Sequence, residues 1–457
     1  MGEFSKLNGH DVKDLISRKK TDLFTTPELY GAKGDGVNDD TLAIQECFND
    51  HNGRVVLMYN TYKITNTIHI PSNIVIDCQG KIVFDGDVER ILLGENCENV
   101  VIKNITMSVI KDFSERTQYN RAINFSECEY VEIDKCSIHG ASTGIHILHG
   151  EKFVLGDCTL SNVFGKEPQY GYGVDTSCKN NIIRSITVRN DDLSHGRHAL
   201  YLNGAIMESC TIGSVYVENW NKNPINIAIS NELTDSVINI DTVIFKNVNY
   251  EPLSTTPGCI HISDINDVSI SKVKFNLGKL DITSAYSTCF SDISKSVGTS
   301  VGDITVRSLP PATNTSSVIV YFRQGSKKSV RSIKVEGLNT DWLSCINCRD
   351  CIDCVCEDLA VYDDISVTPI RVNNSNLLVG NIFIKNNITP YTASNSGKLE
   401  YMSGPASVKF LPAIPTTGNW NIGDIIINSS PSAGEPFGWV CTSSGDPGTW
   451  NIFATVN

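Results

Sequence analysis

Apolar residues recur along the middle of the chain in groups of four, spaced by two, three and two positions. The series begins with Val100, Ile102, Ile105 and Met107. A step of two residues keeps side chains on one face of a β-strand, whereas a step of three requires a bend that leaves the apolar face turned inward. Each group therefore predicts a strand, a corner and a second strand.

The spacing returns in copies that begin roughly 21 to 34 residues apart, which is typical of a solenoid. These further copies start at Val131, Phe153, Cys210, Ile238, Val268, Val301, Ile333, Cys354 and Leu377. A unit of this length cannot bury its apolar face alone, but coils stacked about 4.8 Å apart share a continuous core. The sequence predicts an all-β, single-stranded parallel β-helix over residues 53–386.

A second ladder of short strands accompanies the first, at residues 122–127, 144–149, 173–178, 199–204, 226–231 and 259–264. The second and fourth positions of these segments are almost all aliphatic or Phe, so the third and fifth positions must face outward. The third positions are Asn124, His146, Asp175, Tyr201, Ala228 and His261, and the fifth are Ser126, Leu148, Ser177, Asn203, Ser230 and Ser263. Stacked in register about 5 Å apart, they predict a sugar-binding floor.

Long connections enter this face and would form the wall of a groove, since binding residues often lie on loops above a rigid scaffold. They span residues 108–121, 162–172, 189–198, 219–225 and 248–258. Aromatic rings stack on sugars, and Arg or carboxylate groups bind hydroxyls or acidic sugars. The predicted substrate-binding residues of floor and wall are Arg197, His198, His261, Tyr172, Trp220, Asn203 and Glu167.

Two kinds of chemistry fit these residues. Glycoside hydrolysis needs a carboxylic acid that protonates the leaving oxygen and a second carboxylate that acts as base or nucleophile. Asp175 is the predicted floor carboxylate, with Asp191, Asp192 or Glu167 as its partner.

A polysaccharide lyase would instead need a base beside a uronate carboxylate and a cation that neutralises this carboxylate. His146, Tyr201, His198 and Arg197 could form such a set. Three non-catalytic interpretations also stay open: an adhesin that holds glycan in the same groove, a structural spike, and an ordinary solvated sheet face.

Both ends of the chain differ from the repeats. Residues 39–50 (DDTLAIQECFND) have the apolar spacing of a short amphipathic helix that would cap the first coil, with Asp39 or Asp40 accepting hydrogen bonds from its first amides. Residues 387–457 predict a small β-domain, because short apolar runs alternate with Ser, Pro and Gly turns in 419–452.

The segment YGAKGDGVNDDTLAIQ, residues 30–45, resembles the opening signature of the pectate-lyase-like right-handed β-helix superfamily, which includes many bacteriophage tailspikes and capsular polysaccharide depolymerases. Residues 419–452 resemble the C-terminal β-domain of phage tailspikes. The resemblance implies a homotrimer, made in a bacterial cytoplasm, attached to phage tail or baseplate proteins on the virion, and cleaving a bacterial surface polysaccharide as a glycosidase rather than a lyase. Pectin hydrolysis is disfavoured, because the Gly-His-Gly and Arg-Ile-Lys motifs of polygalacturonases do not occur.

Composition narrows the range of partners. The net charge of −13 and the pI of about 5.2 argue against nucleic acid. No apolar run approaches the roughly 20 residues needed to span a bilayer, and the first residues, MGEF, could be a vector-derived leader. The 16 cysteines fall at repeat positions and are predicted to be reduced core thiols, although Cys345, Cys348 and Cys351 fit no repeat position. We expect neither a metal nor another cofactor.

Overall fold

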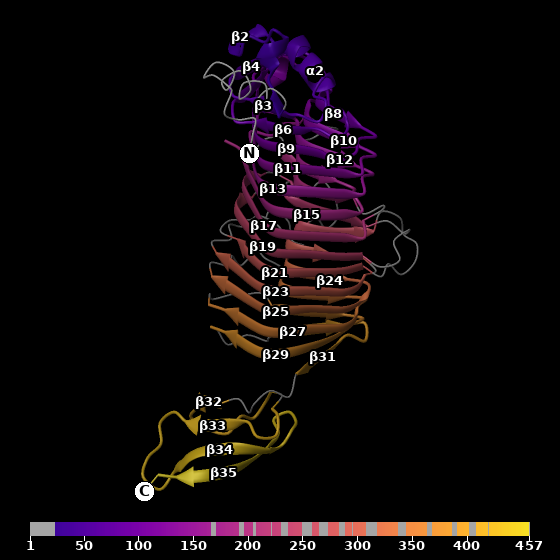
Figure 1. Cartoon of the computed structure of the whole chain (residues 1–457). Helices are drawn as coiled ribbons and strands as arrows, with labels where there is room; N and C mark the ends of the chain where they lie inside the picture. The colour runs from indigo at the N-terminus through magenta and orange to yellow at the C-terminus, as the bar shows by residue number, and fades with distance from the viewer. Residues whose placement is uncertain are drawn as a thin grey trace, which may run out of the picture.

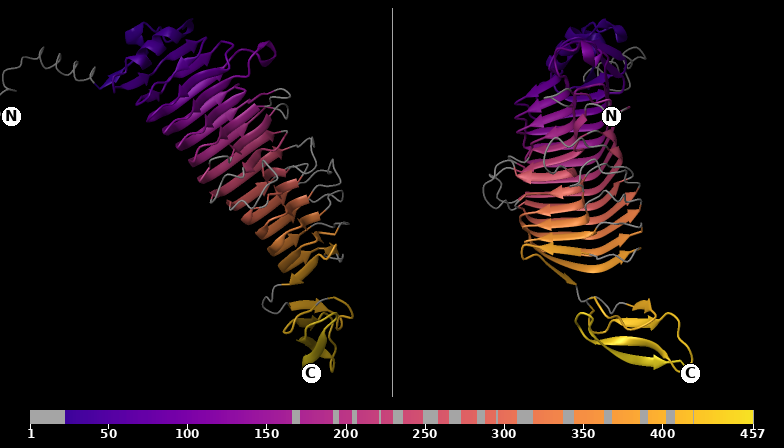
Figure 2. Two further views of the ribbon diagram at one scale, coloured as in Figure 1. Left: turned by 90° about the vertical axis from the view of Figure 1, so that its right-hand side faces the viewer. Right: turned by 180° about the vertical axis from the view of Figure 1, so that it is seen from behind.

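The computed structural model describes residues 23–165, 171–191, 196–203, 207–220, 222–229, 236–248, 258–264, 273–282, 288–294, 296–307, 318–336, 344–362, 368–385, 391–401, 408–418 and 420–456. Within them the chain winds into the predicted right-handed parallel β-helix. Figures 1 and 2 show its coils stacked along one axis, with a small yellow β-domain beyond the last coil. Among the described residues, no helix has the length and apolar character needed to cross a bilayer.

Two parallel ladders form the walls of the β-helix. The first, here called sheet A, consists mainly of long bent strands: β9 (Val100–Val109), β11 (Tyr130–His139), β13 (Lys152–Ser161), β15 (Asn180–Arg189), β17 (Ser209–Trp220), β19 (Ser236–Val248), β21 (Val273–Ile282), β23 (Val297–Arg307), β25 (Ser326–Glu336), β27 (Ile352–Val361) and β29 (Asn376–Ile384). It ends with the short strand β31 (Lys398–Tyr401). Shorter strands begin it: β1 (Phe24–Thr25), β2 (Asp35–Asp39), β3 (Val55–Met58), β4 (Thr61–Ile64), β6 (Val75–Cys78) and β7 (Lys81–Phe84).

The second ladder, here called sheet B, consists of short strands: β5 (Ile68–His69), β8 (Arg90–Glu95), β10 (Arg121–Ser126), β12 (Thr143–Leu148), β14 (Gly171–Thr176), β16 (Gly196–Asn203), β18 (Ile225–Ile229), β20 (Gly258–Asp264), β22 (Thr288–Asp292), β24 (Val318–Arg323), β26 (Ser344–Arg349), β28 (Ile370–Asn373) and β30 (Tyr391–Ser394). Sheet A thus starts before residue 53, at Phe24, and both ladders continue past residue 386, to Tyr401 in sheet A and to Ser394 in sheet B. Two short 3-10 helices, Pro27–Tyr30 and Phe113–Glu115, lie outside the sheets.

The spacing of two, three and two residues marks inward-facing positions on either side of a corner, as predicted. Strands β11 and β13 pair so that Val131 lies opposite Phe153, and Cys136 opposite Cys158. All of these side chains are buried. The three-residue step contains the corner, where Lys135 adopts a φ of 52°. Inward-facing apolar residues of one coil therefore stack on inward-facing apolar residues of the next.

Two of the predicted copies have the wrong register. In β21, Leu277 and Leu280 pair with Ile240 and Val243, so this coil is displaced from the copy predicted to start at Val268, which lies outside the described residues. In β25, the inward positions begin at Lys328 rather than at Ile333. The spacing of apolar residues does not reveal this copy, because a lysine occupies its first inward position.

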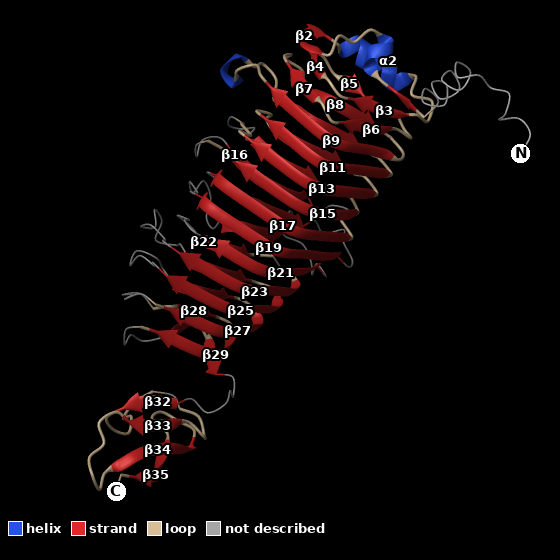
Figure 3. Cartoon of the chain, turned by 60° about the vertical axis from the view of Figure 1, so that its left-hand side comes forward, coloured by secondary structure: helices blue, strands red, loops and turns tan. Residues whose placement is uncertain are grey.

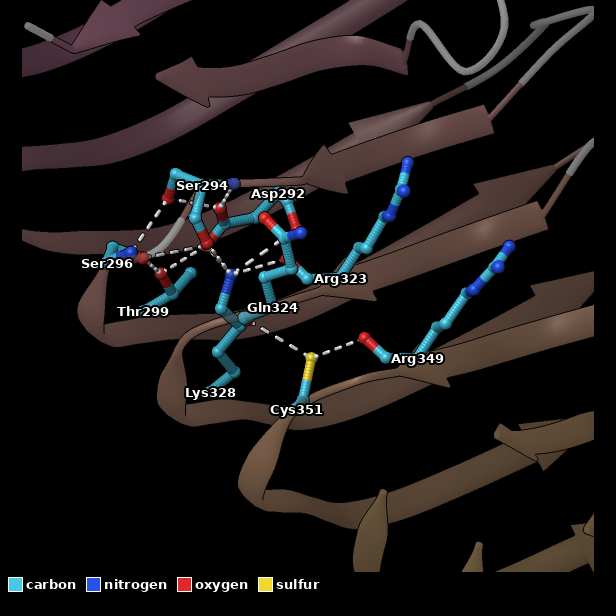
Figure 4. Close-up of polar contacts among 9 residues, drawn as sticks. All are labelled: Asp292, Ser294, Ser296, Thr299, Arg323, Gln324, Lys328, Arg349 and Cys351. Atoms are coloured by element: carbon cyan, nitrogen blue, oxygen red, sulfur yellow. Dashed lines mark hydrogen bonds and ion pairs between the residues drawn. The ribbon is translucent and has the colours of Figure 1, made fainter. Parts of the chain in front are cut away.

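Lys328 is buried inside the β-helix, where an ion pair and backbone carbonyls surround its ammonium (Figure 4). Its Nζ lies 2.9 Å from Asp292 Oδ2 and donates to Ser294 O, also at 2.9 Å. The Asp292 carboxylate also accepts hydrogen bonds from the hydroxyls of Ser294 and Thr299. A buried charge requires this kind of compensation, since an unpaired ammonium in the interior would be strongly destabilising.

A helix caps the first coils, as predicted. Helix α2 (Thr41–Asn49) lies at the N-terminal end of the β-helix in Figure 3, and its residues Ile44 and Phe48 are buried. Asp39 accepts a hydrogen bond from the Thr41 amide, while Asp40 accepts from the amides of the preceding turn. Leu42, one of the apolar residues of this segment, is 79% exposed, so the buried stripe of the helix is narrower than the apolar spacing indicated.

All 16 cysteines are free and buried, which confirms the prediction of reduced core thiols. Cys345 and Cys348, which fitted no repeat, face inward on β26 and are 0% exposed. Cys351 lies at the turn before β27, where its thiol donates to the carbonyls of Gln324 and Arg349 (Figure 4). These three residues thus have structural positions that the pattern did not reveal.

The C-terminal unit is a four-stranded sheet made of β32 (Val408–Leu411), β33 (Ile425–Asn428), β34 (Pro436–Ser443) and β35 (Thr449–Thr455). Its first two strands are parallel and the others antiparallel. Trp420, Ile426, Trp439 and Cys441 form its small core, separate from that of the β-helix.

Candidate functional site

The outer face of sheet B carries one continuous row of in-register residues. Pairing along the ladder brings Asn124 beside His146, His146 beside Asp175, and Asp175 beside Tyr201. The predicted stacking of these residues is therefore confirmed. The next members of this row are Asn226, His261, Ser291, Tyr321, Asn347 and Arg371.

One member of the predicted row was wrong. Asn226, not Ala228, continues the row after Tyr201, and Ala228 pairs with Asn203 and Ser263 in the row of fifth positions. The alternation in residues 225–229 fits two registers that differ by two residues, and only pairing with the neighbouring strands selects one of them. Ser230, the predicted fifth position of this segment, lies outside the described residues.

Polar contacts link Asn124, His146 and Asp175 across three strands. His146 Nδ1 lies 2.9 Å from Asn124 Oδ1, and its Nε2 lies 3.4 Å from Asp175 Oδ2. The amide oxygen of Asn124 can only accept, so Nδ1 carries the ring proton. Burial lowers the pKa of His146 to about 3, with the nearby Arg121 and Arg90 acting in the same direction, so the ring is neutral. Its Nε2 lone pair then faces Asp175.

Asp175 is the most unusual acid of this face. Its side chain is 13% exposed, and its Oδ1 is buried without a hydrogen-bond partner. Burial raises the pKa of Asp175 to about 7, although the positive charge of Arg121 acts in the opposite direction. A protonated Asp175 can donate to His146 Nε2, so the neutral imidazole and the raised pKa are mutually consistent. An acid with a pKa near neutrality is suited to proton transfer.

Aromatic rings adjoin Asp175 on the next strands. Tyr172 and His198 lie on β14 and β16, with ring centroids 5.5 Å apart, and His198 stacks on Tyr201 at 5.2 Å. The guanidinium of Arg197 lies 5.9 Å from the Tyr172 ring centroid. Burial raises the pKa of Tyr201 and lowers that of His198 to about 3, so the phenol stays protonated and the imidazole neutral. The sequence assigned Tyr172, Arg197 and His198 to loops, but they belong to the strands.

The remaining predicted residues have different surroundings. Asp191, proposed as the partner of Asp175, hydrogen bonds with Asn162 at the end of β15 instead. Trp220 is 0% exposed at the end of β17, so it is a core residue and cannot stack on a sugar as predicted. Asn203 and His261 line the outer face, and each has one buried polar atom without a partner. Glu167 and Asp192 lie outside the described residues.

A separate hollow of about 450 Å³ lies over sheet A. Polar and charged side chains of β19, β21, β25 and β27 line it, among them Asn276, Arg331 and Glu357. Its walls belong to the other ladder, so it is distinct from the Asp175 row. Among the described residues, no group of three or more His, Cys, Asp or Glu side chains has the geometry of a metal site.

The second ladder predicted from the sequence ends at residue 264. Segments 318–323, 344–349 and 370–373 continue the same alternation and bring Tyr321, Asn347 and Arg371 to the outer face. The signal for this second half of the face was present in the sequence. Arg121 was assigned to a loop, and its electrostatic effect on Asp175 required the three-dimensional structure.

Comparison with known proteins gives few relatives. No protein-family model matches the chain, and no curated protein is significantly similar to it in sequence. Among solved structures, the pre-mature gene product 12 of bacteriophage phi29 matches with 14% identity over 85% of this chain and 75% of that chain, with a TM-score of 0.24. An N-terminal fragment of the same gene product matches with 13% identity over 86% of this chain and 96% of the fragment, with a TM-score of 0.17. TM-scores this low do not establish a shared overall arrangement and say nothing about function.

Proposed function

We propose that the chain is a bacteriophage tailspike that binds and cleaves a bacterial surface polysaccharide on the outer face of sheet B. The observation that carries the proposal is the environment of Asp175, whose pKa is raised to about 7 beside His146 and Tyr201. The N-terminal segment of residues 30–45, which resembles the opening signature of the tailspike superfamily, supports the same class.

In this proposal Asp175 is the general acid. In its protonated form it donates a proton to the glycosidic oxygen as the bond to the leaving sugar breaks. Arg121 favours the carboxylate that this transfer leaves behind, since its charge acts to lower the pKa of Asp175. The rings of Tyr172 and Tyr201, 5.8 Å apart, offer apolar faces on which sugar rings can stack.

Hydrolysis also requires a base or nucleophile. Asp191 is held by Asn162, which leaves Glu167 and Asp192 as the candidate second carboxylates from the sequence. A lyase has less support, because the raised pKa of Tyr201 and the lowered pKa of His146 make both groups poor bases at neutral pH.

A non-catalytic adhesin is the second candidate function. The observation that favours it is that, within the described residues, the charge acting on the pKa of Asp175 is that of Arg121, and no second carboxylate contributes. The same aromatic and polar face could hold a glycan without cleaving it.

The test is to incubate the purified chain with capsular polysaccharides from a panel of bacterial strains and to analyse the released oligosaccharides. We expect release from at least one capsule, a loss of at least about 100-fold in Asp175→Asn, and activity that falls as the pH rises above about 7. Asp157→Asn on sheet A, where Asp157 binds Arg184, is the matched control and should retain activity. Binding without release on any capsule would support the adhesin, and products with the ultraviolet absorbance of an unsaturated uronate would indicate a lyase.

A further inference from the structure

Three arginines lie together on the outer face of sheet B, near its C-terminal end. Arg323 on β24 is the direct partner of Arg349 on β26, and Arg371 on β28 is the partner of Asn347. Figure 4 shows the side chains of Arg323 and Arg349 extending side by side, away from the interior that holds Lys328. With strands about 4.8 Å apart, the backbones of Arg323 and Arg349 are one strand spacing apart, and that of Arg371 is about 8 Å from Arg349.

Within the part of the chain that the structure describes, one ion pair compensates the positive charges of this arginine cluster (Arg323, Arg349 and Arg371). Among the described residues, the acid in ion-pair contact with them is Asp350, 3.4 Å from Arg349 Nε. The Nε atoms of Arg323 and Arg371 are buried and have no hydrogen-bond partner. Like charges on directly adjacent strands repel, and a buried donor without a partner costs free energy. Such an arrangement favours the binding of an anion, although the chain as a whole carries a net charge of −13.

The surroundings of the cluster restrict the ligand. Tyr321 and Asn347 lie beside it in the central outward row. Burial raises the pKa of Tyr321, while the charges of Arg323 and Arg349 act to lower it. Tyr321 is 6% exposed, so it is a buried neighbour of the cluster and leaves the ligand contacts to the arginines. Guanidinium groups bind carboxylates, sulfates and phosphates through two parallel hydrogen bonds, and their rigid fork suits planar recognition.

We propose that Arg323, Arg349 and Arg371 form a subsite that binds the oxyanion of an acidic saccharide, either a carboxylate or a sulfate. That the oxyanion is carried by a saccharide rests on the proposed function; the oxyanion site itself does not. Arg371 lies in the same row as Asp175, seven strands further along, which is about 34 Å. The subsite is therefore remote from the proton donor and contributes binding and specificity for a long, negatively charged glycan.

The test compares binding of three polymers of matched length by titration calorimetry: polygalacturonate, dextran sulfate and neutral dextran. We expect the wild-type chain to bind at least one polyanion and not dextran. Arg323→Gln combined with Arg371→Gln should weaken polyanion binding by at least about tenfold. The single variant Arg349→Gln should weaken polyanion binding as well. Because Arg349 is exposed, this variant keeps the test valid even if the double variant misfolds.

The matched control is Arg184→Gln combined with Arg331→Gln. It removes the same charge from sheet A, where Arg184 pairs with Asp157 and Arg331 with Asp303. Binding of the control should stay within about twofold of the wild type, because these guanidiniums are already neutralised. If the chain binds polygalacturonate alone, the site recognises a carboxylate, and if it binds dextran sulfate alone, the site recognises a sulfate. Binding of both polymers shows that the site accepts either oxyanion.

Two results would overturn the subsite. One is that the wild-type chain binds neither polyanion, and the other is that the control loses as much affinity as the cluster variants, which would indicate attraction by net charge only. Asp175→Asn should bind the polyanion like the wild type. A failure of cleavage therefore leaves the subsite intact, and a failure of polyanion binding leaves the role of Asp175 untouched.

Discussion

Replacing Asp175 by asparagine should stabilise the protein at neutral and alkaline pH, although we expect it to abolish cleavage. Burial raises the pKa of Asp175 from 3.8 to about 7, which corresponds to about 4 kcal/mol. Between these two values the carboxyl of the unfolded chain is ionised while that of the folded chain remains protonated. The folded state then binds more protons than the unfolded state, so its stability falls as the pH rises.

Asparagine cannot ionise, so the variant escapes this loss. The free energy of unfolding of Asp175→Asn relative to the wild type should therefore increase from near zero at about pH 4 to as much as about 4 kcal/mol at about pH 8. The increase should be concentrated between the two pKa values of the carboxyl. Denaturant unfolding followed by tryptophan fluorescence over this pH range measures it, with unfolding rates used if refolding is incomplete.

Asp157→Asn is a control variant whose effect on stability should have the opposite sign. A hydrogen bond from Ser185 and the charge of Arg184 hold the pKa of Asp157 below its usual value, so its carboxylate stabilises the fold above that value and the contribution is lost as the pH falls. The asparagine variant should be less stable than the wild type at neutral pH and equal to it in acid. A difference between Asp175→Asn and wild type that stays constant from about pH 4 to about pH 8 would refute the argument that burial perturbs Asp175.

Two further predictions concern stability. Lys328→Ala should lower the free energy of unfolding by about 3 to 5 kcal/mol, because it leaves the Asp292 carboxylate buried without its ion pair; denaturant unfolding with the wild-type midpoint would contradict this. In the capping helix, Phe48→Ala should cost about 3 to 5 kcal/mol, whereas Leu42→Ala should change stability by less than about 0.5 kcal/mol, since Phe48 is 2% and Leu42 79% exposed. Equal thermal shifts for the two helix variants would show that the cap is packed differently.

The repeat of apolar positions was sufficient to predict the β-helix, its two ladders and the outward row of His146, Asp175 and Tyr201. A solenoid repeats one local unit, so the same alternation that turns a side chain inward also determines which residues of neighbouring coils become partners. The capping helix and the separate C-terminal β-domain could be predicted for a similar reason, because periodicity changes where each begins.

Register and burial were decided by the tertiary structure. Asn226 rather than Ala228 follows Tyr201 because both registers satisfy the local alternation and only the neighbouring strands distinguish them. Lys328 occupies an inward position because Asp292, 36 residues earlier in the chain, neutralises it there. The sequence by itself determined which residue types face the outside of each coil. The pKa of Asp175 and the ion pairing of the arginine cluster depend on which groups pack around them, and residues far apart in the chain supply those groups.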